Sequence, residues 1–494
     1  MRRFCARYLM EFNEKSKAMR WCVLIFILLG IGPVVAQQDM SFEKALLTML
    51  ENSKLIKSEQ YSIDAAYNEL RAAKGLRWPK IDIVGSVALM QKDVDIDFGG
   101  AKGVVTQAVN QLISEGVKSG LLSSDVASLI NTGLEPLRSL DWRYTLQKRF
   151  VGVVGASLTV PIYMGGRINI ANRAARITLD AATYSLDAVE SRLLTELVER
   201  YFGVIVARHL CEVRIEARDA ISKHLSDVME MEKEGVVAHS AVVFMQYKLA
   251  EAERDLMDAN NKLHVAELAL NSTVGVDEGI NPIDRIFLCN NIYSVDYYSD
   301  MASSLNPILC EVRLGKQLSE EGVRLARAAL LPEVVAMGAG NIYNYQLNSS
   351  VPRWSIGVGI SIPLFDGLGK EYRYKAAKSE LRSVEEYVEN AQSEIMLLVE
   401  KEYYTFENTL ANINATKQAI ALAETYYYSA NEGFLAGIVA ASELMDACVE
   451  VAGAKVEYLN AVYENCLALA RLLEASGLSG TFLKYMSNGV KVDI

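Results

Sequence analysis

Four segments of the chain alternate large apolar side chains with small residues. In residues 355–364 a branched apolar side chain stands at every second position, with glycine, serine or proline between. A period of two puts the large side chains on one face of a β-strand. Residues 81–90, 152–163 and 334–345 show the same pattern. We therefore expect four strands, each with an apolar and a small-residue face, and we expect Gly359 on the second face to accept serine.

Two long proline-free segments follow these strands. They run from 167 to about 234 and from 368 to about 436, and strong helix formers dominate both. At 1.5 Å per residue each helix would be roughly 100 Å long, which favours packing side by side with other helices. Shorter helices are expected at 240–273 and 442–475. Incoming helices at about 42–77 and 299–330 would stack end to end with these shorter ones and complete the length.

The sequence is written twice. An offset of 202 residues places Gly235 on Gly437 and the following Val236 on Ile438, and the strands and long helices match at the same offset. Residues 37–281 and 282–478 are thus two helix–strand–strand–helix repeats, followed by a tail at 479–494. Residues 94–140 form an enlarged loop, helical in places, between the strands of the first repeat.

The amino-terminal segment has the features of a signal peptide. Residues 21–36 are apolar, basic residues precede them, and the small residue Ala36 closes them. We expect residues 1–36 to be removed on export, with Met1 and Met19 both open as the start of translation. Cys22 begins the apolar run rather than following it, which argues against a lipoprotein.

Composition narrows the class of protein further. The chain has 494 residues, 51% of them hydrophobic, and a net charge of −11. These values exclude a disordered chain and disfavour nucleic acid as a partner. Beyond residue 40 there is no run of about 20 apolar residues, so membrane insertion would use the strands. One strand alone fits a soluble sandwich equally well, but four strands in two hairpins are too few to close a barrel without other copies.

No catalytic or metal-binding motif is found. The four histidines lack ligand spacing, and residues 367–370 depart from a phosphate loop. No believable nucleophile stands out. We therefore expect no enzyme activity, no cofactor and no metal. A periplasmic adaptor or a coiled-coil structural protein of the cell envelope stays open as the alternative, although an adaptor would need a lipoyl-like domain.

Three motifs carry a family resemblance. Residues 360–367, ISIPLFDG, join a strand to a long helix, residues 305–307 read LNP, and residues 433–446 read GFLAGIVAASELMD. In this order they resemble the TolC-like outer membrane efflux proteins, also called outer membrane factors. The resemblance implies a mainly α fold with β, in which three chains form a 12-stranded β-barrel continued by a periplasmic α-helical tunnel.

The resemblance also implies a function and partners. It implies a homotrimer in outer membrane lipid, extending into the periplasm and acting as the exit duct of a tripartite efflux or secretion system. Small molecules or drugs would reach it from an inner-membrane pump through a periplasmic adaptor, a membrane fusion protein. In this setting residues 94–140 are expected outside the cell, where they could cap the pore.

Site residues follow from the same resemblance. The turns between the helices imply adaptor contacts, and their residues are Gly235, Val236, Val237, Gly437, Ile438 and Val439. Glu443 and Asp446 correspond to acidic rings at the periplasmic aperture, and Phe434 to an aromatic position that locks it. Because Phe434 has no hydroxyl and Val439 replaces an arginine, a lock made of those hydrogen bonds and salt bridges is in doubt.

Overall fold

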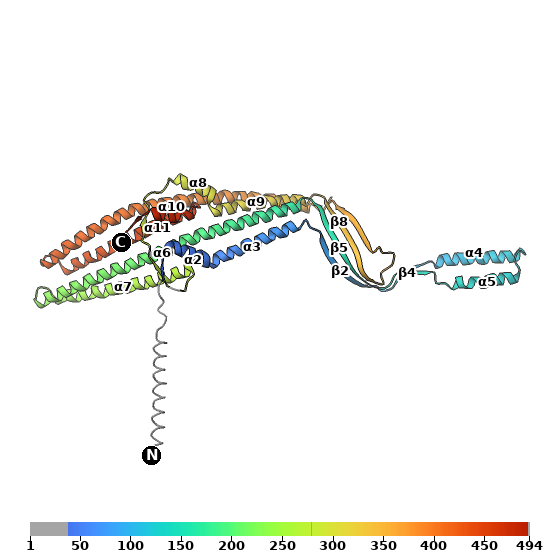
Figure 1. Ribbon diagram of the computed structural model, residues 1–494, viewed down its shortest axis with the longest axis horizontal. Helices are drawn as coiled ribbons and strands as arrows, with labels where there is room; N and C mark the ends of the chain where they lie inside the picture. The colour runs from blue at the N-terminus through green and yellow to red at the C-terminus, as the bar shows by residue number, and fades with distance from the viewer. Residues whose placement is uncertain (1–37, 278, 493–494) are drawn as a thin grey trace, which may run out of the picture. The chain divides into compact units, whose positions relative to one another are not determined.

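The computed structural model describes residues 38–277 and 279–492 (Figure 1). The predicted signal peptide, residues 1–36, lies outside the described residues. The chain forms two units. The helical unit contains the described residues up to Asn68, Arg176–Glu320 and the chain from Glu380 onward. The sheet unit contains Glu69–Ala175 and Glu321–Ser379.

Both repeats have the predicted order of elements. The first repeat contains α2 (Phe42–Asn52), α3 (Lys54–Gly75), β2 (Lys80–Leu89), β5 (Phe150–Met164), α6 (Arg167–Lys233) and α7 (His239–Val274). The second contains α8 (Val295–Leu305), α9 (Pro307–Ala328), β8 (Glu333–Tyr345), β9 (Trp354–Ser361), α10 (Gly369–Leu435) and α11 (Ala441–Ala475). The fold is mainly α with β, as predicted. The helix–strand alternation is confirmed, whereas the boundaries at 281/282 and 478/479 stay predictions.

The incoming segments correct one prediction, because each is a pair of helices rather than one. Ser53 separates α2 from α3, and its hydroxyl accepts a hydrogen bond from the Ile56 amide at 3.4 Å. Asn306 separates α8 from α9, and its side-chain oxygen accepts from the Leu309 amide at 3.0 Å. Both residues are N-caps, which begin a new helix by satisfying an unpaired amide of its first turn.

The shorter helices end at these breaks, so the predicted end-to-end stacking is confirmed. The Asn52 amide donates to the Gly275 carbonyl beyond α7 at 3.1 Å, and the Asn306 amide donates to the Ala475 carbonyl of α11 at 2.9 Å. A side chain at Gly477 would place its Cβ 2.6 Å from the Leu305 backbone. The close approach at the second joint therefore requires glycine.

The four predicted strands form one antiparallel sheet in the order β2-β5-β8-β9. The register aligns Ile81 with Leu158, Leu158 with Gly338, and Gly338 with Ile356. In an antiparallel sheet directly opposed residues share a face, so the apolar residues of all four strands lie on the same side. Their side chains are exposed in the single chain, 73% at Ile81 and 80% at Ile356. The sheet therefore presents a continuous apolar face to its surroundings.

The expectation for Gly359 needs a correction. A Cβ at this position would lie 2.8 Å from the terminal Cε of Met337, so serine is accommodated only if the flexible methionine end moves. Gly357 lies on the same face, and no atom is found within 4 Å of its Cβ position. Gly357 is therefore the small-residue position that tolerates serine without rearrangement.

The insertion at 94–140 is a helical hairpin. The strands β3 (Val94–Asp97) and β4 (Arg143–Gln147) pair with each other and lead into α4 (Gly99–Lys118) and α5 (Ser124–Ser139). The expectation of helix in this loop is confirmed. The Met90 amide donates to the Arg149 carbonyl at 2.6 Å, which continues the pairing of β2 and β5 toward this insertion.

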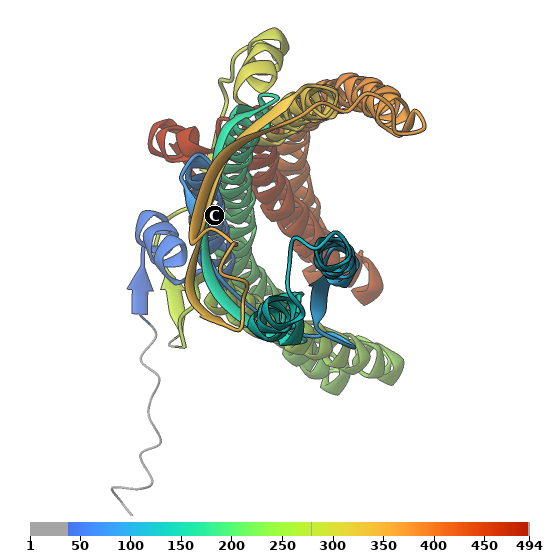
Figure 2. The ribbon, with the colours of Figure 1, turned by 90° about the vertical axis from the view of Figure 1, so that its right-hand side faces the viewer.

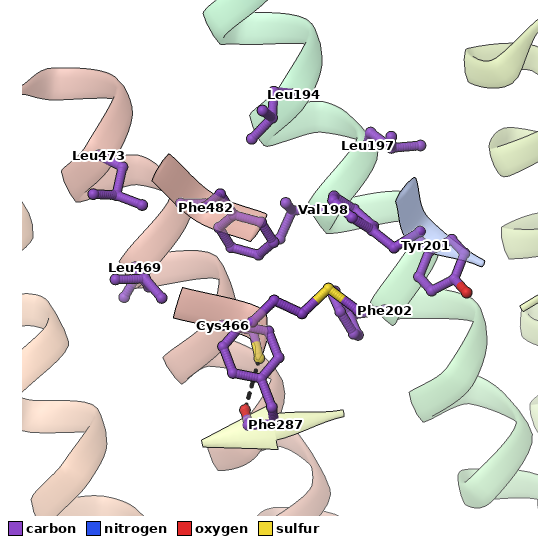
Figure 3. Packing of buried hydrophobic residues seen from close by; sticks show 14 of the residues in the cluster. Leu194, Leu197, Val198, Tyr201, Phe202, Phe287, Cys466, Leu469, Leu473 and Phe482 are labelled. Atoms are coloured by element: carbon purple, nitrogen blue, oxygen red, sulfur yellow. Dashed lines mark hydrogen bonds between the residues drawn. The ribbon is translucent and has the colours of Figure 1, made fainter. Parts of the chain in front are cut away.

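The core of the helical unit lies where the ends of the chain meet the long helices. Tyr201 and Phe202 of α6 pack near Phe287 of β7 (Phe287–Leu288) and Phe482 of α12 (Phe482–Asn488), and all four are 0% exposed (Figure 3). The Cys466 thiol donates to the Phe287 carbonyl at 3.0 Å. The predicted tail at 479–494 thus supplies part of the core through α12.

Short strands complete the helical unit: β1 (Gln38–Met40) pairs with β6 (Ile280–Pro282), and β10 (Val490–Lys491) with β7. Ser479–Thr481 forms a 3-10 turn. Among the residues that the structure describes, no helix combines the length and apolar character needed to cross a membrane.

Candidate functional site: the turns of the two long hairpins

The turns after α6 and α10 have the same backbone geometry. Gly235 and Gly437 are in the left-handed region, with φ of +72° and +73°. The Val236 amide donates to the Met231 carbonyl at 2.8 Å, and the Ile438 amide to the Gly433 carbonyl at 2.9 Å. A bond across five residues with glycine at the left-handed position is a Schellman motif, which ends a helix sharply. The glycines that the repeat singled out are therefore required by the turns.

Each turn exposes one aliphatic side chain and tucks in the next. Val236 is 62% exposed and Ile438 is 83% exposed. Val237 and Val439 instead pack against buried neighbours. A Cβ at Gly433 would lie 2.5 Å from the Val439 side chain, so glycine at 433 is what lets Val439 fold inward. Both turns thus present a glycine and an exposed aliphatic residue.

Behind the turns lies a second buried group, which we call the tip cluster. It contains Ile221 and Val228 of α6, Val242 and Met245 of α7, Ala430 and Phe434 of α10, and Leu444, Met445, Ala447 and Cys448 of α11. Phe434 is 3% exposed. In the single chain Phe434 therefore holds α10 against its neighbours, and its assignment to the aperture stays a prediction that would require the cluster to open.

One polar contact joins the two hairpins beside the tip cluster. The His224 Nε2 on α6 lies 2.8 Å from the Tyr427 hydroxyl on α10. Burial lowers the pKa of His224 below its ordinary value of 6.5, although the Asp227 carboxylate 3.8 Å from Nδ1 acts in the other direction. Burial also raises the pKa of Tyr427. Both groups are therefore neutral near pH 7, and the contact is a neutral hydrogen bond.

A small cavity of about 140 Å³ adjoins this contact. Tyr427, Cys448 and residues of α6 and α11 line it, and the Lys455 ammonium lies 2.7 Å from the Glu216 carboxylate at its border. The hairpins are thus less tightly packed here than in the tip cluster, which leaves room for them to move relative to each other.

The two candidate acidic residues are exposed on the first turns of α11. Glu443 and Asp446 are three residues apart and share one side of the helix. Lys248 of α7 lies close enough to be affected by Asp446, although the hydrogen bond it donates to Glu251 is the main reason that the pKa of Lys248 is raised. The first repeat has Ala241 and Phe244 at the corresponding positions, so acidic residues occur at only one of the two tips.

Sequence reasoning missed the pairing of His224 with Tyr427. The two residues are 203 positions apart, and their meeting depends on how α6 and α10 are rotated about their axes. The only signal in the sequence is a polar residue pair near the ends of two long apolar seams. Within the described residues no group of three His, Cys, Asp or Glu side chains is arranged to hold a metal.

Comparison with known proteins agrees with this architecture. The sequence profile of the family described as "Outer membrane efflux protein" matches residues 299–478. The chain is related to the TolC-like outer membrane efflux proteins. It is 25% identical to the protein CyaE of Bordetella pertussis over 342 residues, which are 66% of this chain and 71% of CyaE. It is 22% identical to the outer membrane protein TolC of Escherichia coli over 311 residues, 60% of this chain and 63% of TolC.

A solved structure extends the likeness of fold over most of the chain. The CmeC outer membrane channel of Campylobacter jejuni has a TM-score of 0.68 and 14% identity, covering 90% of this chain and 88% of CmeC. The family match covers α8 onward in the TolC-like second repeat, including its turn at Gly437 and both acidic residues of α11. The match spans less than two thirds of TolC itself.

Proposed function

We propose that this protein is the outer membrane channel of a tripartite efflux or secretion system. In this proposal three copies join their sheets into a 12-stranded barrel, and their long helices continue as a tunnel in the periplasm. An inner-membrane pump delivers small molecules or drugs through a periplasmic adaptor. The protein itself catalyses no reaction and serves as the exit duct.

The observation that carries the proposal is the sheet. Its apolar face is exposed across all four strands, a property that lipid-facing strands share. β2 and β9 are its outer strands and run in opposite directions. β9 of one copy can therefore pair antiparallel with β2 of the next, and the sheet closes without a change of pattern. Closure removes the unpaired strand edges, which lipid does not tolerate.

The experiment compares substitutions on the two faces of β9. Val358 is 62% exposed on the apolar face, and arginine at the middle of a bilayer costs about 2 to 4 kcal/mol per strand. Val358→Arg is expected to abolish assembly in the outer membrane, whereas the matched Gly357→Ser assembles normally. Membrane fractionation and the mass of the solubilised protein are measured for both. Normal assembly of Val358→Arg, or recovery of the unaltered protein as a soluble periplasmic chain, refutes the proposal.

The turns are proposed as the adaptor contact, with Gly235, Val236 and Val237 in one and Gly437, Ile438 and Val439 in the other. Support comes from their shared geometry and from the exposed Val236 and Ile438. A flat left-handed turn with one aliphatic side chain lets a partner hairpin approach the backbone closely.

Ile438→Asp tests the adaptor contact without straining the turn. Export is expected to fall while the amount of protein in the membrane is unchanged. The control is Leu422→Asp on α10, which is also exposed, at 71%, and lies outside the turn. Export that is equal in the two variants would remove Ile438 from the contact.

The aperture is proposed to lie at the same end, with Glu443 and Asp446 as acidic rings and Phe434 behind them. Their exposure on α11 supports this for the acidic residues. Phe434 reaches the aperture in this proposal only when the tip cluster loosens.

A further inference from the structure

The α4–α5 hairpin carries more apolar surface than its own packing uses. The two helices lie side by side and are seen end-on in Figure 2. The side chains between them are the less exposed ones, spaced three and four residues apart. They are Thr106, Val109, Ile113 and Gly116 on α4, and Ala127, Ile130, Leu134 and Arg138 on α5. We call these residues the seam of the hairpin.

The seam itself is well determined. A Cβ at Gly116 would lie 2.5 Å from Leu122, and Arg138 donates to the side chains of Asn110 and Asn131. The Lys102 ammonium donates to the Leu140 carbonyl at 2.7 Å and ties the open end of the hairpin together. The rotation of each helix about its axis is thereby fixed, so the positions that face outward are fixed as well.

A second row of apolar or small residues directly precedes the seam on both helices. On α4 it contains Val105, Ala108 and Leu112, and on α5 it contains Val126, Leu129, Gly133 and Leu137. Each stands one residue before a seam residue, which corresponds to a rotation of about 100°. Because the helices run antiparallel, equal rotations in the same sense bring both rows to the same side of the hairpin. We call this side the apolar face.

The apolar face is open and uncharged. Leu112 is 68% exposed and Leu129 is 75% exposed, and no charged residue occurs in 103–114 or in 126–134. The opposite side carries polar residues such as Ser114 and Thr132. A broad apolar surface on a helix pair marks a contact with another molecule, and the lack of charge makes the face compatible with an identical face.

The sheet indicates which molecule that is. The β3–β4 ribbon connects the hairpin to the ends of β2 and β5, in the same unit as the two unpaired edges of the sheet. Copies that pair β9 with β2 therefore place their hairpins at one common end of the assembly. Any other partner would have to displace neighbours that are already there.

We propose that the hairpins of three copies pack through their apolar faces into a six-helix bundle at the loop end of the barrel. The inference rests on the proposed function, because only the trimer brings three hairpins together. The bundle buries Leu112 and Leu129 against their counterparts, in the way that apolar rows associate in helical bundles.

Cysteine cross-linking in membranes tests the bundle. Leu112→Cys and Leu129→Cys are compared with Ser114→Cys and Thr132→Cys on the polar side after mild oxidation. Among the described residues four of the five native cysteines are buried, and Cys310 is partly exposed, so unsubstituted protein serves as the baseline. One cysteine per chain in a threefold cluster can join only two chains, so about two thirds of the chains should run as dimers. The polar-side variants should stay monomeric on the gel.

A second substitution and a second measurement separate the possible failures. Leu112→Asp in the Leu129→Cys background should abolish the cross-link, and Ser114→Asp should preserve it. The mass of the solubilised protein reports the trimer independently. A trimer without cross-links at 112 or 129 overturns the bundle but leaves the channel proposal intact, whereas loss of the trimer in unsubstituted protein contradicts the channel proposal itself. Reaction of both apolar-face cysteines only with a lipid-soluble maleimide, without cross-links, would assign the face to lipid and also overturn the bundle.

Discussion

Removing the Tyr427 hydroxyl tests whether the contact with His224 holds the two hairpins together near the tips. Tyr427→Phe keeps the ring and deletes only the group that lies 2.8 Å from His224 Nε2. Tyr428→Phe is the matched control, because Tyr428 is the next residue on α10 and is 67% exposed. The two variants differ from the natural protein by the same atom, and only one of them loses a contact.

The size of the effect follows from the burial of the pair. A neutral hydrogen bond contributes about 1 kcal/mol net, and a buried partner left unpaired adds to the loss. A free-energy difference of this size changes an equilibrium about fivefold. If opening separates α6 from α10 at the tips, Tyr427→Phe should raise the ratio of open to closed channels by at least about fivefold.

The same contact gives the opening a pH dependence of known sign. Burial holds the pKa of His224 below 6.5 when the hairpins are together, so separated hairpins bind a proton more readily. The contact is therefore fully present above about pH 6.5 and weakens as the pH falls through the interval down to the lowered pKa. The Asp227 carboxylate opposes this shift and Lys223 adds to it. His224→Gln should remove that part of the pH dependence.

Two measurements decide the matter. Single-channel recording in planar bilayers gives the open-to-closed ratio between pH 5 and pH 8. Spin labels at Val236→Cys and Ile438→Cys, in trimers formed with excess unlabelled chain, report the separation of the tips directly. Equal ratios and equal label distances in the Tyr427→Phe and Tyr428→Phe proteins would refute the reasoning, because the contact would then not restrain the hairpins.

Two further substitutions test the joint and the acidic residues. Asn306→Ala should lower the free energy of unfolding by about 2 to 4 kcal/mol, since it removes an N-cap and leaves the buried Ala475 carbonyl unpaired; the exposed Asn52→Ala should lower it by less than about 1 kcal/mol, and equal losses in urea unfolding would contradict the difference. The double variant Glu443→Gln with Asp446→Asn should lose block of the channel by divalent cations, and salt should weaken the block in the natural protein; identical block in both proteins would place these carboxylates outside the aperture.

The strands could be predicted because their pattern is local. Alternation with a period of two determines which side chains share a face, and the register of β9 with β8 confirmed it for Ile356 and Val358. Steric details across strands are not local. Gly359 was expected to accept a side chain freely, and only the position of Met337 on the neighbouring strand shows that it does not.

Helix ends and turns were also predictable where the backbone demands a particular residue. Gly235 and Gly437 stand at positive φ, and the repeat alone identified them. The breaks at Ser53 and Asn306 were not predicted, because a capping residue within a helix-forming stretch is a weak signal. The contact of His224 with Tyr427 lies beyond sequence patterns altogether, since it depends on how two helices are rotated against each other.

Where the two repeats differ is as informative as where they agree. The left-handed glycines and the joints that place Asn52 and Asn306 recur in both, because stacked helices and tight turns impose the same steric demands on each copy. The helical insertion occurs only in the first repeat, and the acidic pair of α11 only in the second. Packing gives no reason for either feature, since the fold is complete in the repeat that lacks it. These unpaired features therefore mark where contact between copies and contact with transported ions should be sought, at opposite ends of the repeat's order of elements.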